Sequence, residues 1–134
     1  MPTLVYFEDL VLDERLETPG LTLTEAHVRL FRGFAPEACE DPVVVPELLP
    51  LCLSTGLAWR VARPPVAVLA FMGLEWRALS PLRVGDTIRS RSRTVTKRGM
   101  RDGGVVVEER DIVNQRDEIA QHGRLTLLVA RKPA

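Results

Sequence analysis

The spacing of hydrophobic and polar residues changes after Pro64 and Pro65, and the second part of the chain predicts strands. Runs with strand-like spacing cover residues 66–77, 87–97, 105–114 and 119–130. They are separated by turn-forming segments at residues 84–86, 101–104 and 115–117. Gly73, inside the first run, is a candidate β-bulge. Successive strands joined by short turns predict an antiparallel meander.

Two helices are expected ahead of these strands. Thr22 and Glu25 have the spacing of a capping box, and an apolar stripe at helical spacing follows them. These features predict a short helix over residues 24–32, ended by Gly33. Residues 47–61 are apolar nearly all round, which predicts a helix that is buried on most sides.

The segment between the helices, residues 34–47, holds three prolines and four carboxylates, so a loop is expected there. One buried helix followed by a long meander is an α+β architecture. The length of 134 residues fits one domain that spans residues 1–134.

Charge and hydropathy exclude several classes of function. Eighteen basic and eighteen acidic side chains give a formal net charge of zero, which disfavours binding to nucleic acid or to an anionic membrane. Residues 1–47 hold ten acids and three bases, so we expect them to attract the basic remainder, within one fold or across a dimer. No apolar stretch approaches the roughly 20 residues of a membrane span. The N-terminus lacks a secretory pattern, and we expect a cytoplasmic protein.

The two cysteines do not indicate a metal or redox site. Cys39 and Cys52 have neither C-x-x-C spacing nor a neighbouring histidine cluster. We expect free, buried thiols and no bound metal.

Several segments resemble one known family, in the right order and over most of the chain. They are YFEDL (6–10), ETPGLTLTEA (17–26), Leu48 and Leu49 with STGL (54–57), FMGL (71–74), LSPLRVGDTI (79–88) and VNQRDE (113–118). Together they resemble the MaoC-like dehydratases, a hot-dog fold group that includes (R)-specific enoyl-CoA hydratases.

The resemblance implies a single hot-dog domain, an antiparallel sheet wrapped around one central helix. It also implies a homodimer or higher homo-oligomer that binds an acyl-CoA thioester in a tunnel at the subunit boundary. Coenzyme A would enter as part of the substrate, and no separate cofactor is expected.

The family's catalytic motif is missing from this chain. Active members carry D-x-N-P-x-H between the two helices, and its Asp and His handle the water that adds to the enoyl double bond. Residues 34–47 contain neither histidine nor asparagine. The acids there, Glu37, Glu40, Asp41 and Glu47, are therefore the candidate catalytic residues. Glu47, at the start of the buried helix, would act as a base in thioester hydrolysis, as in related hot-dog thioesterases; alternatively, it complements the helix dipole.

Candidate binding residues lie on the central helix. Ser54, Thr55 and Gly56 are placed to hydrogen-bond a bound acyl thioester. The alternative for the two hydroxyls is a bond to carbonyls of their own helix. His27 and His122, the only histidines, are expected to be surface or otherwise satisfied side chains, with His122 near a turn.

A basic stripe is predicted on the strand at residues 87–97. Strict alternation places Arg89, Arg91, Arg93 and Lys97 on one face. Arginine forks suit the phosphates of coenzyme A. The alternative is an outer sheet face that pairs with Glu109 and Asp111 of the next strand.

Two classes of function remain open. The first is an enzyme of acyl-CoA metabolism that uses substitute residues, or receives a dyad from a partner chain. The second is a non-catalytic subunit that binds an acyl thioester or stabilises an active partner.

Overall fold

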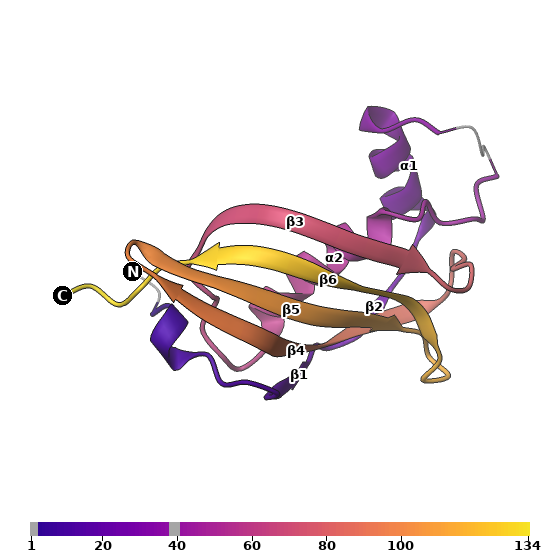
Figure 1. Ribbon diagram of the computed structural model, residues 1–134. Coiled ribbons are helices and arrows are strands. Elements are labelled where there is room, and N and C mark those ends of the chain that lie inside the picture. Colours follow the sequence, from indigo (N-terminus) through magenta and orange to yellow (C-terminus); the bar gives the residue numbers. More distant parts are fainter. Residues whose placement is uncertain (1–2, 38–40) are drawn as a thin grey trace.

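A six-stranded antiparallel sheet lies against helix α2 in the computed structural model, which describes residues 3–37 and 41–134 (Figure 1). The strands are β1 (Arg15–Glu17), β2 (Leu21–Thr22), β3 (Val68–Ala78), β4 (Thr87–Met100), β5 (Gly103–Val113) and β6 (Ile119–Val129). The helices are α1 (Glu25–Phe34) and α2 (Leu49–Leu57), with 3-10 turns η1 (Phe7–Asp9) and η2 (Ala58–Arg60). The strand order is β1-β4-β5-β6-β3, and β2 also pairs with β4. This arrangement confirms the α+β prediction.

The four long strands and their turns lie where the hydrophobic pattern predicts them. Gly85 and Asp117, in two of the expected turns, have left-handed backbone with φ of 101° and 61°. The pairing of β3 with β6 is irregular between Phe71 and Gly73, so the bulge expected near Gly73 is confirmed.

The predicted strict alternation of β4 is wrong beyond Thr94. The pairing with β5 shifts by one residue between Thr94 and Thr96, which leaves Val95 without a partner. Because a one-residue shift turns every later side chain to the opposite face, Lys97 does not share a face with the preceding arginines. Its Nζ donates to the Leu10 carbonyl at 2.6 Å and lies 4.6 Å from the centre of the Phe7 ring.

Helix α1 begins with a different cap from the one predicted. Thr24 is the N-cap, and its hydroxyl accepts the His27 N–H at 3.3 Å while His27 Nδ1 accepts the Thr24 N–H at 3.0 Å. Thr22 instead lies in β2. Gly33 does not end the helix, which continues to Phe34.

Helix α2 is shorter than predicted; most of its residues are buried, and one side is exposed. Its inner side chains, among them Leu49, Ser54 and Leu57, are buried. Cys52 and Leu48 are exposed, so the expectation of a buried thiol is wrong for Cys52; Cys39 lies outside the described residues. An apolar helix side is thus left uncovered in the single chain.

Two hydrophobic cores lie at opposite ends of the inner sheet face. One joins α1 and α2 to the sheet through Leu23, Val28, Leu49, Ile88, Ile112 and Ala120. The other packs the η1 region on the far end through Phe7, Leu10, Val106 and Val129. By the strand register, residues 90–92, 108–110 and 125–127 lie between the two cores.

The acidic N-terminal part binds the basic remainder within one fold, as its charge predicts. Glu17 pairs with Arg89, Asp13 pairs with Arg93 at 2.7 Å, and Asp9 pairs with Lys132 at 2.7 Å. The Lys132 ammonium, through its hydrogen bond, holds the pKa of the Asp9 carboxyl below its usual value.

Gly123 on β6 provides a test of this packing. A Cβ at this position would overlap the Glu75 carbonyl oxygen and the Trp76 ring. Gly123→Ala is therefore expected to lower the free energy of unfolding by about 1–3 kcal/mol in urea titrations. Gly33→Ala, in α1 with no atom within 4 Å of its new methyl group, is the matched control and should stabilise by up to about 1 kcal/mol. Wild-type stability of Gly123→Ala would contradict this packing.

Candidate functional site

A cavity of about 540 Å³ lies between the two cores, bounded by the C-terminal half of α2, the inner sheet face and residues 61–68. Its size is typical of sites for small ligands. Its wall is mainly apolar and includes Leu4, Leu16, Ala58, Trp59, Val61, Val66, Val68, Phe71, Leu125 and Leu127. Trp59 and Phe71 are 66% and 59% exposed, so the cavity opens to solvent beside them.

A polar cluster around Arg110 forms part of the cavity wall. Arg110 is only 6% exposed. Its Nε donates to Glu108 at 2.7 Å, and its Nη1 donates to the hydroxyls of Ser54 at 3.0 Å and Thr55 at 3.1 Å. Both hydroxyls donate in turn to the Leu51 carbonyl. The expected bonds of Ser54 and Thr55 within their helix are thus confirmed, and the same oxygens also hold the guanidinium.

One nitrogen of this guanidinium remains open. Arg110 Nη2 makes no hydrogen bond to any residue that the structure describes. No described side-chain nitrogen or oxygen is both sealed from solvent and unpartnered. Nη2 therefore faces open space, and the cavity is the space that Arg110 borders.

Sequence reasoning missed Arg110, although the sequence carries a signal for it. Val106, Glu108, Arg110 and Ile112 occupy alternate positions of β5 and so share its inner face. Charged residues placed between apolar positions of an inward face have to be satisfied by special partners. That conflict marks Arg110 as a candidate functional residue.

The acids proposed from the sequence lie elsewhere. Glu37 pairs with Arg32 at 3.2 Å, and Asp41 accepts the Val43 N–H at 3.0 Å. Glu47 is exposed, and its backbone carbonyl accepts Gln121 Nε2 at 2.8 Å. None of these three side chains lines the 540 Å³ cavity, and their catalytic role stays a prediction. Glu40 lies outside the described residues.

Gly56 also lies apart from the cavity wall. It is an exposed position of α2, with no atom within 4 Å of where a Cβ would stand. The structure therefore brings Ser54 and Thr55 together with Arg110 and leaves Gly56 outside this group.

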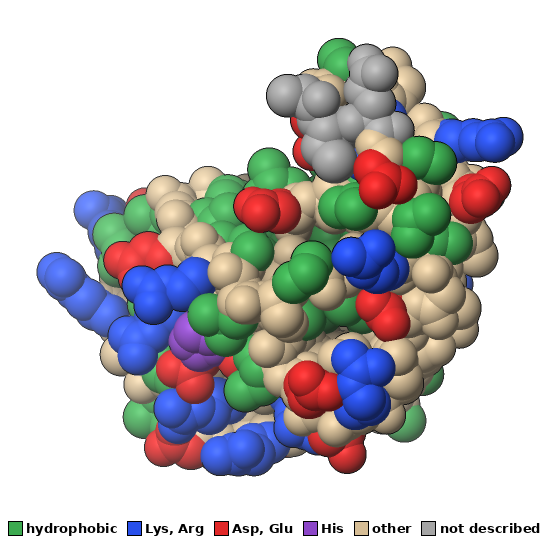
Figure 2. All heavy atoms as spheres, turned by 90° about the vertical axis from the view of Figure 1, so that its right-hand side faces the viewer, with side chains coloured by type: hydrophobic (Ala, Val, Ile, Leu, Met, Phe, Trp, Pro, Cys, Tyr) green, Lys and Arg blue, Asp and Glu red, His purple; other side chains and the backbone are tan. Residues whose placement is uncertain are grey.

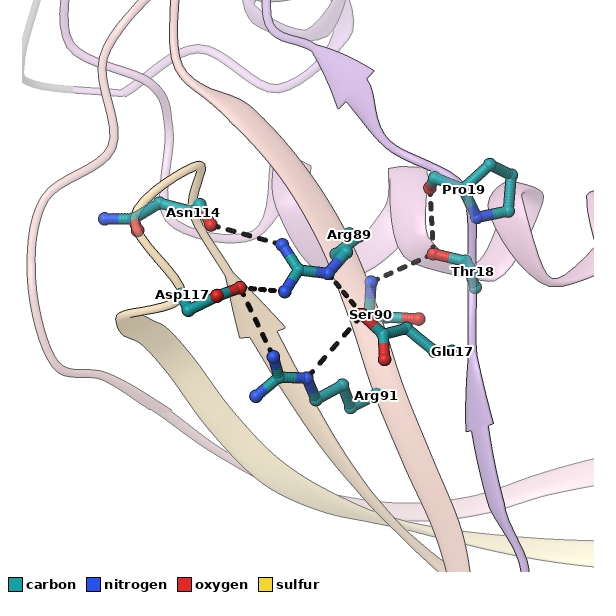
Figure 3. A network of polar contacts seen from close by, with 8 residues as sticks. All are labelled: Glu17, Thr18, Pro19, Arg89, Ser90, Arg91, Asn114 and Asp117. Atoms are coloured by element: carbon teal, nitrogen blue, oxygen red, sulfur yellow. Dashed lines mark hydrogen bonds and ion pairs between the residues drawn. The ribbon is translucent and has the colours of Figure 1, made fainter.

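The three arginines of the basic stripe are engaged in ion pairs on the outer sheet face. Arg89 pairs with Glu17 and Asp117, and Arg91 pairs with Asp117 at 3.3 Å (Figure 3). Arg93 binds its cross-strand neighbour Glu109 at 3.1 Å. On the face of the molecule seen in Figure 2, Lys and Arg side chains likewise lie interspersed with Asp and Glu side chains. Phosphate binding here stays a prediction, and it would have to compete with these carboxylates.

The two histidines have partners, as expected. His27 caps α1 through Thr24, and His122 Nδ1 bonds Asp111 across strands β6 and β5. His122 lies within β6, however, and the expectation of a turn near it is wrong.

The described residues contain no group of three or more His, Cys, Asp or Glu side chains placed to hold a metal ion. In the same part of the chain, no helix is long and apolar enough to cross a membrane.

Comparisons with known proteins give matches in structure but not in sequence. No family model and no curated protein matches the chain. A monoamine oxidase regulatory protein from Archaeoglobus fulgidus aligns with a TM-score of 0.83 at 23% identity, covering 97% of both chains. A MaoC-like dehydratase from Rhodospirillum rubrum aligns with a TM-score of 0.82 at 20% identity, covering 96% of this chain and 99% of the other.

The (R)-hydratase PhaJ1 from Pseudomonas aeruginosa aligns with a TM-score of 0.74 at 14% identity, covering 96% of this chain and 87% of the hydratase. The matches include a protein described as a double hot-dog. The chain therefore has the hot-dog fold, in the form found in MaoC-like dehydratases and (R)-hydratases, as the sequence resemblance implies.

Acid titration tests the ion pairs of the outer face. The Arg89 guanidinium, by its hydrogen bond, holds the pKa of the Asp117 carboxyl below its usual value. The ionised carboxylate therefore stabilises the fold above the unfolded-state pKa of about 4, and this contribution is lost as the pH falls. Between pH 6 and pH 3, the unfolding free energy of Asp117→Asn should fall less steeply than that of wild type in urea titrations. An equal slope would contradict the assignment.

Proposed function

We propose that this protein binds an acyl-CoA thioester and holds its acyl group in the 540 Å³ cavity. The observation that carries the proposal is a largely apolar cavity beside the central helix of a fold shared with MaoC-like dehydratases and (R)-hydratases. An apolar wall suits an acyl chain, and a few placed polar groups give selectivity. Coenzyme A enters as part of the ligand, in the cytoplasm.

A binding role, without the hydration chemistry, is the function that the geometry favours. Adding water to an enoyl thioester needs a base for the water and a proton donor for the substrate. Residues 34–47 supply neither histidine nor asparagine. Glu37, Asp41 and Glu47 lie off the cavity, and Glu108, the carboxylate on its described wall, is engaged by Arg110.

The second candidate is an enzyme with a substitute carboxylate. Glu108 borders the cavity, and Glu47 lies just before α2, where a base would take a proton from the water that attacks the thioester carbonyl and releases the thiol. Either would give a hydratase-like or thioesterase-like activity. The position of Glu108 within the cavity wall keeps this alternative open.

The protein is further proposed to be a homodimer joined along β3. β3 forms an edge of the sheet, and its first part exposes the apolar side chains Val68, Leu69, Phe71, Met72 and Leu74, ahead of the exposed charges Glu75 and Arg77. An uncovered apolar edge strand is a template for pairing with another chain. Val68 and Phe71 also line the cavity, so a second copy along this edge would complete the cavity wall.

One assay tests the binding role against the enzyme. Crotonyl-CoA is expected to bind, as measured by calorimetry, without loss of enoyl absorbance and without release of free thiol. If either signal appears, the protein is an enzyme, and Glu47→Ala and Glu108→Gln show which carboxylate serves it. Loss of absorbance means hydration, and thiol release means hydrolysis. Absence of binding by crotonyl-CoA and by every other acyl-CoA thioester tested would overturn the proposed function.

Charges on the β3 edge should break the dimer. Wild type is expected to run at twice the 15.0 kDa chain mass in light scattering, and Leu69→Lys/Met72→Lys at the single mass, because a buried unpaired ammonium strongly disfavours an interface. Leu30→Lys, at an exposed position of α1, is the control and should stay dimeric. A monomeric wild type, or a dimeric double variant, would contradict the β3 interface.

A further inference from the structure

We propose that the acyl group bound by this protein carries a carboxylate at its far end, and that Arg110 and Ser92 bind this carboxylate. The ligand class is thus the mono-thioester of a short dicarboxylic acid. The inference rests on the proposed function, since it assigns a ligand to the same cavity.

The first argument is the position of the guanidinium. Arg110 is more than nine-tenths buried in the cavity wall, and its inward neighbours on β5 are its ion-pair partner Glu108 and the apolar core residue Ile112. Burying a charge is strongly unfavourable unless its donors are satisfied. Nε and Nη1 have partners, and Nη2 is left facing the cavity. A ligand oxygen that accepts a hydrogen bond from Nη2 would give all three nitrogens of the guanidinium a partner.

The second argument is a pair of serine hydroxyls in the cavity wall, one of them on the residue opposite Arg110. Ser92 lies directly opposite Arg110 in the β4–β5 register, so their Cβ atoms are about 5 Å apart. Ser90 and Ser92 both line the cavity, and neither hydroxyl bonds another described side chain or backbone group. The neighbouring inward position of β4 holds the larger Ile88. The small side chains of Ser90 and Ser92 leave room for the ligand, and their hydroxyls can donate hydrogen bonds to it.

The third argument is the charge of the wall. The charged residues that line the cavity are Arg63, Arg110 and Glu108, two cations and one anion. The partner of Arg63, Glu14, is 3.9 Å away and does not line this cavity. A carboxylate on the ligand would give Arg110 Nη2 a charged acceptor, whereas a methyl end would leave this donor unpaired. A charge-assisted hydrogen bond also exceeds a neutral one in strength.

The inference is tested by comparing matched thioesters in calorimetry on the full chain. Succinyl-, glutaryl- and adipyl-CoA are each paired with the alkyl thioester of the same length: butyryl-, pentanoyl- and hexanoyl-CoA. At one length or more, the carboxylate ligand should bind at least about 10-fold more tightly, as expected for one charge-assisted hydrogen bond. Equal or tighter binding of every alkyl partner would overturn the inference and leave the proposed function intact. If no thioester binds, both fail.

Variants assign the preference to Arg110. Glu108→Gln should strengthen binding of the dicarboxylic thioester, because it removes the anion that competes for the guanidinium. Glu108→Gln/Arg110→Gln removes both charges together, leaves no unpaired buried ion, and should abolish the preference. Arg124→Gln, on the outer face beside Glu109, is the control and should keep it. A preference that survives the double variant would overturn the role of Arg110.

Discussion

The inner face of β4, β5 and β6 packs against an apolar helix and also has to form the wall of a cavity beside that helix. Large aliphatic side chains at both ends of these strands form the two cores. Between them, the inward positions carry Ser90, Ser92, Glu108 and Arg110. Because serine is too small to fill the space between the sheet and α2, a hollow remains there beside Arg110, whose side chain does reach the helix. The cavity is a consequence of where small and large residues alternate along three strands.

On the outer face of the same strands the arginines have carboxylate partners, whereas the arginine on the inner face keeps one nitrogen without a partner among the described residues. Arg89, Arg91 and Arg93 each have at least one carboxylate partner. The pairs with Glu17 and Asp13 join the N-terminal segment to β4. They are partly exposed, so water and salt reduce their strength. Inside, Arg110 has an acid and two hydroxyls but retains an unpartnered nitrogen. Arginines with similar sequence neighbours thus make different contacts, because they lie on different faces of the sheet.

Much of this fold could be predicted because the period of the hydrophobic pattern is local. The strands, the turns at Gly85 and Asp117, and the central helix follow from residue spacing alone. The bulge at Val95 could not be predicted, because it depends on how β4 registers against β5. The cap at Thr24 was missed for a related reason. A histidine took the place usually held by glutamate, so the capping-box pattern favoured Thr22.

The site was harder to predict than the fold, because the family resemblance directs attention to the segment that this chain has changed. A search for substitutes of the lost motif leads to Glu37, Asp41 and Glu47, which are near it in sequence. The cavity, however, is assembled from α2, β4, β5 and residues 61–68, segments that only the sheet brings together. Ser54 and Thr55 could be predicted as site residues because they lie on the central helix. Placing Arg110 in the site requires the pairing register of β5 with its neighbouring strands. In a chain whose catalytic segment differs, the cavity wall carries more information about the ligand than the missing motif does. A buried arginine facing that cavity is a feature that a plain alkyl chain would not need.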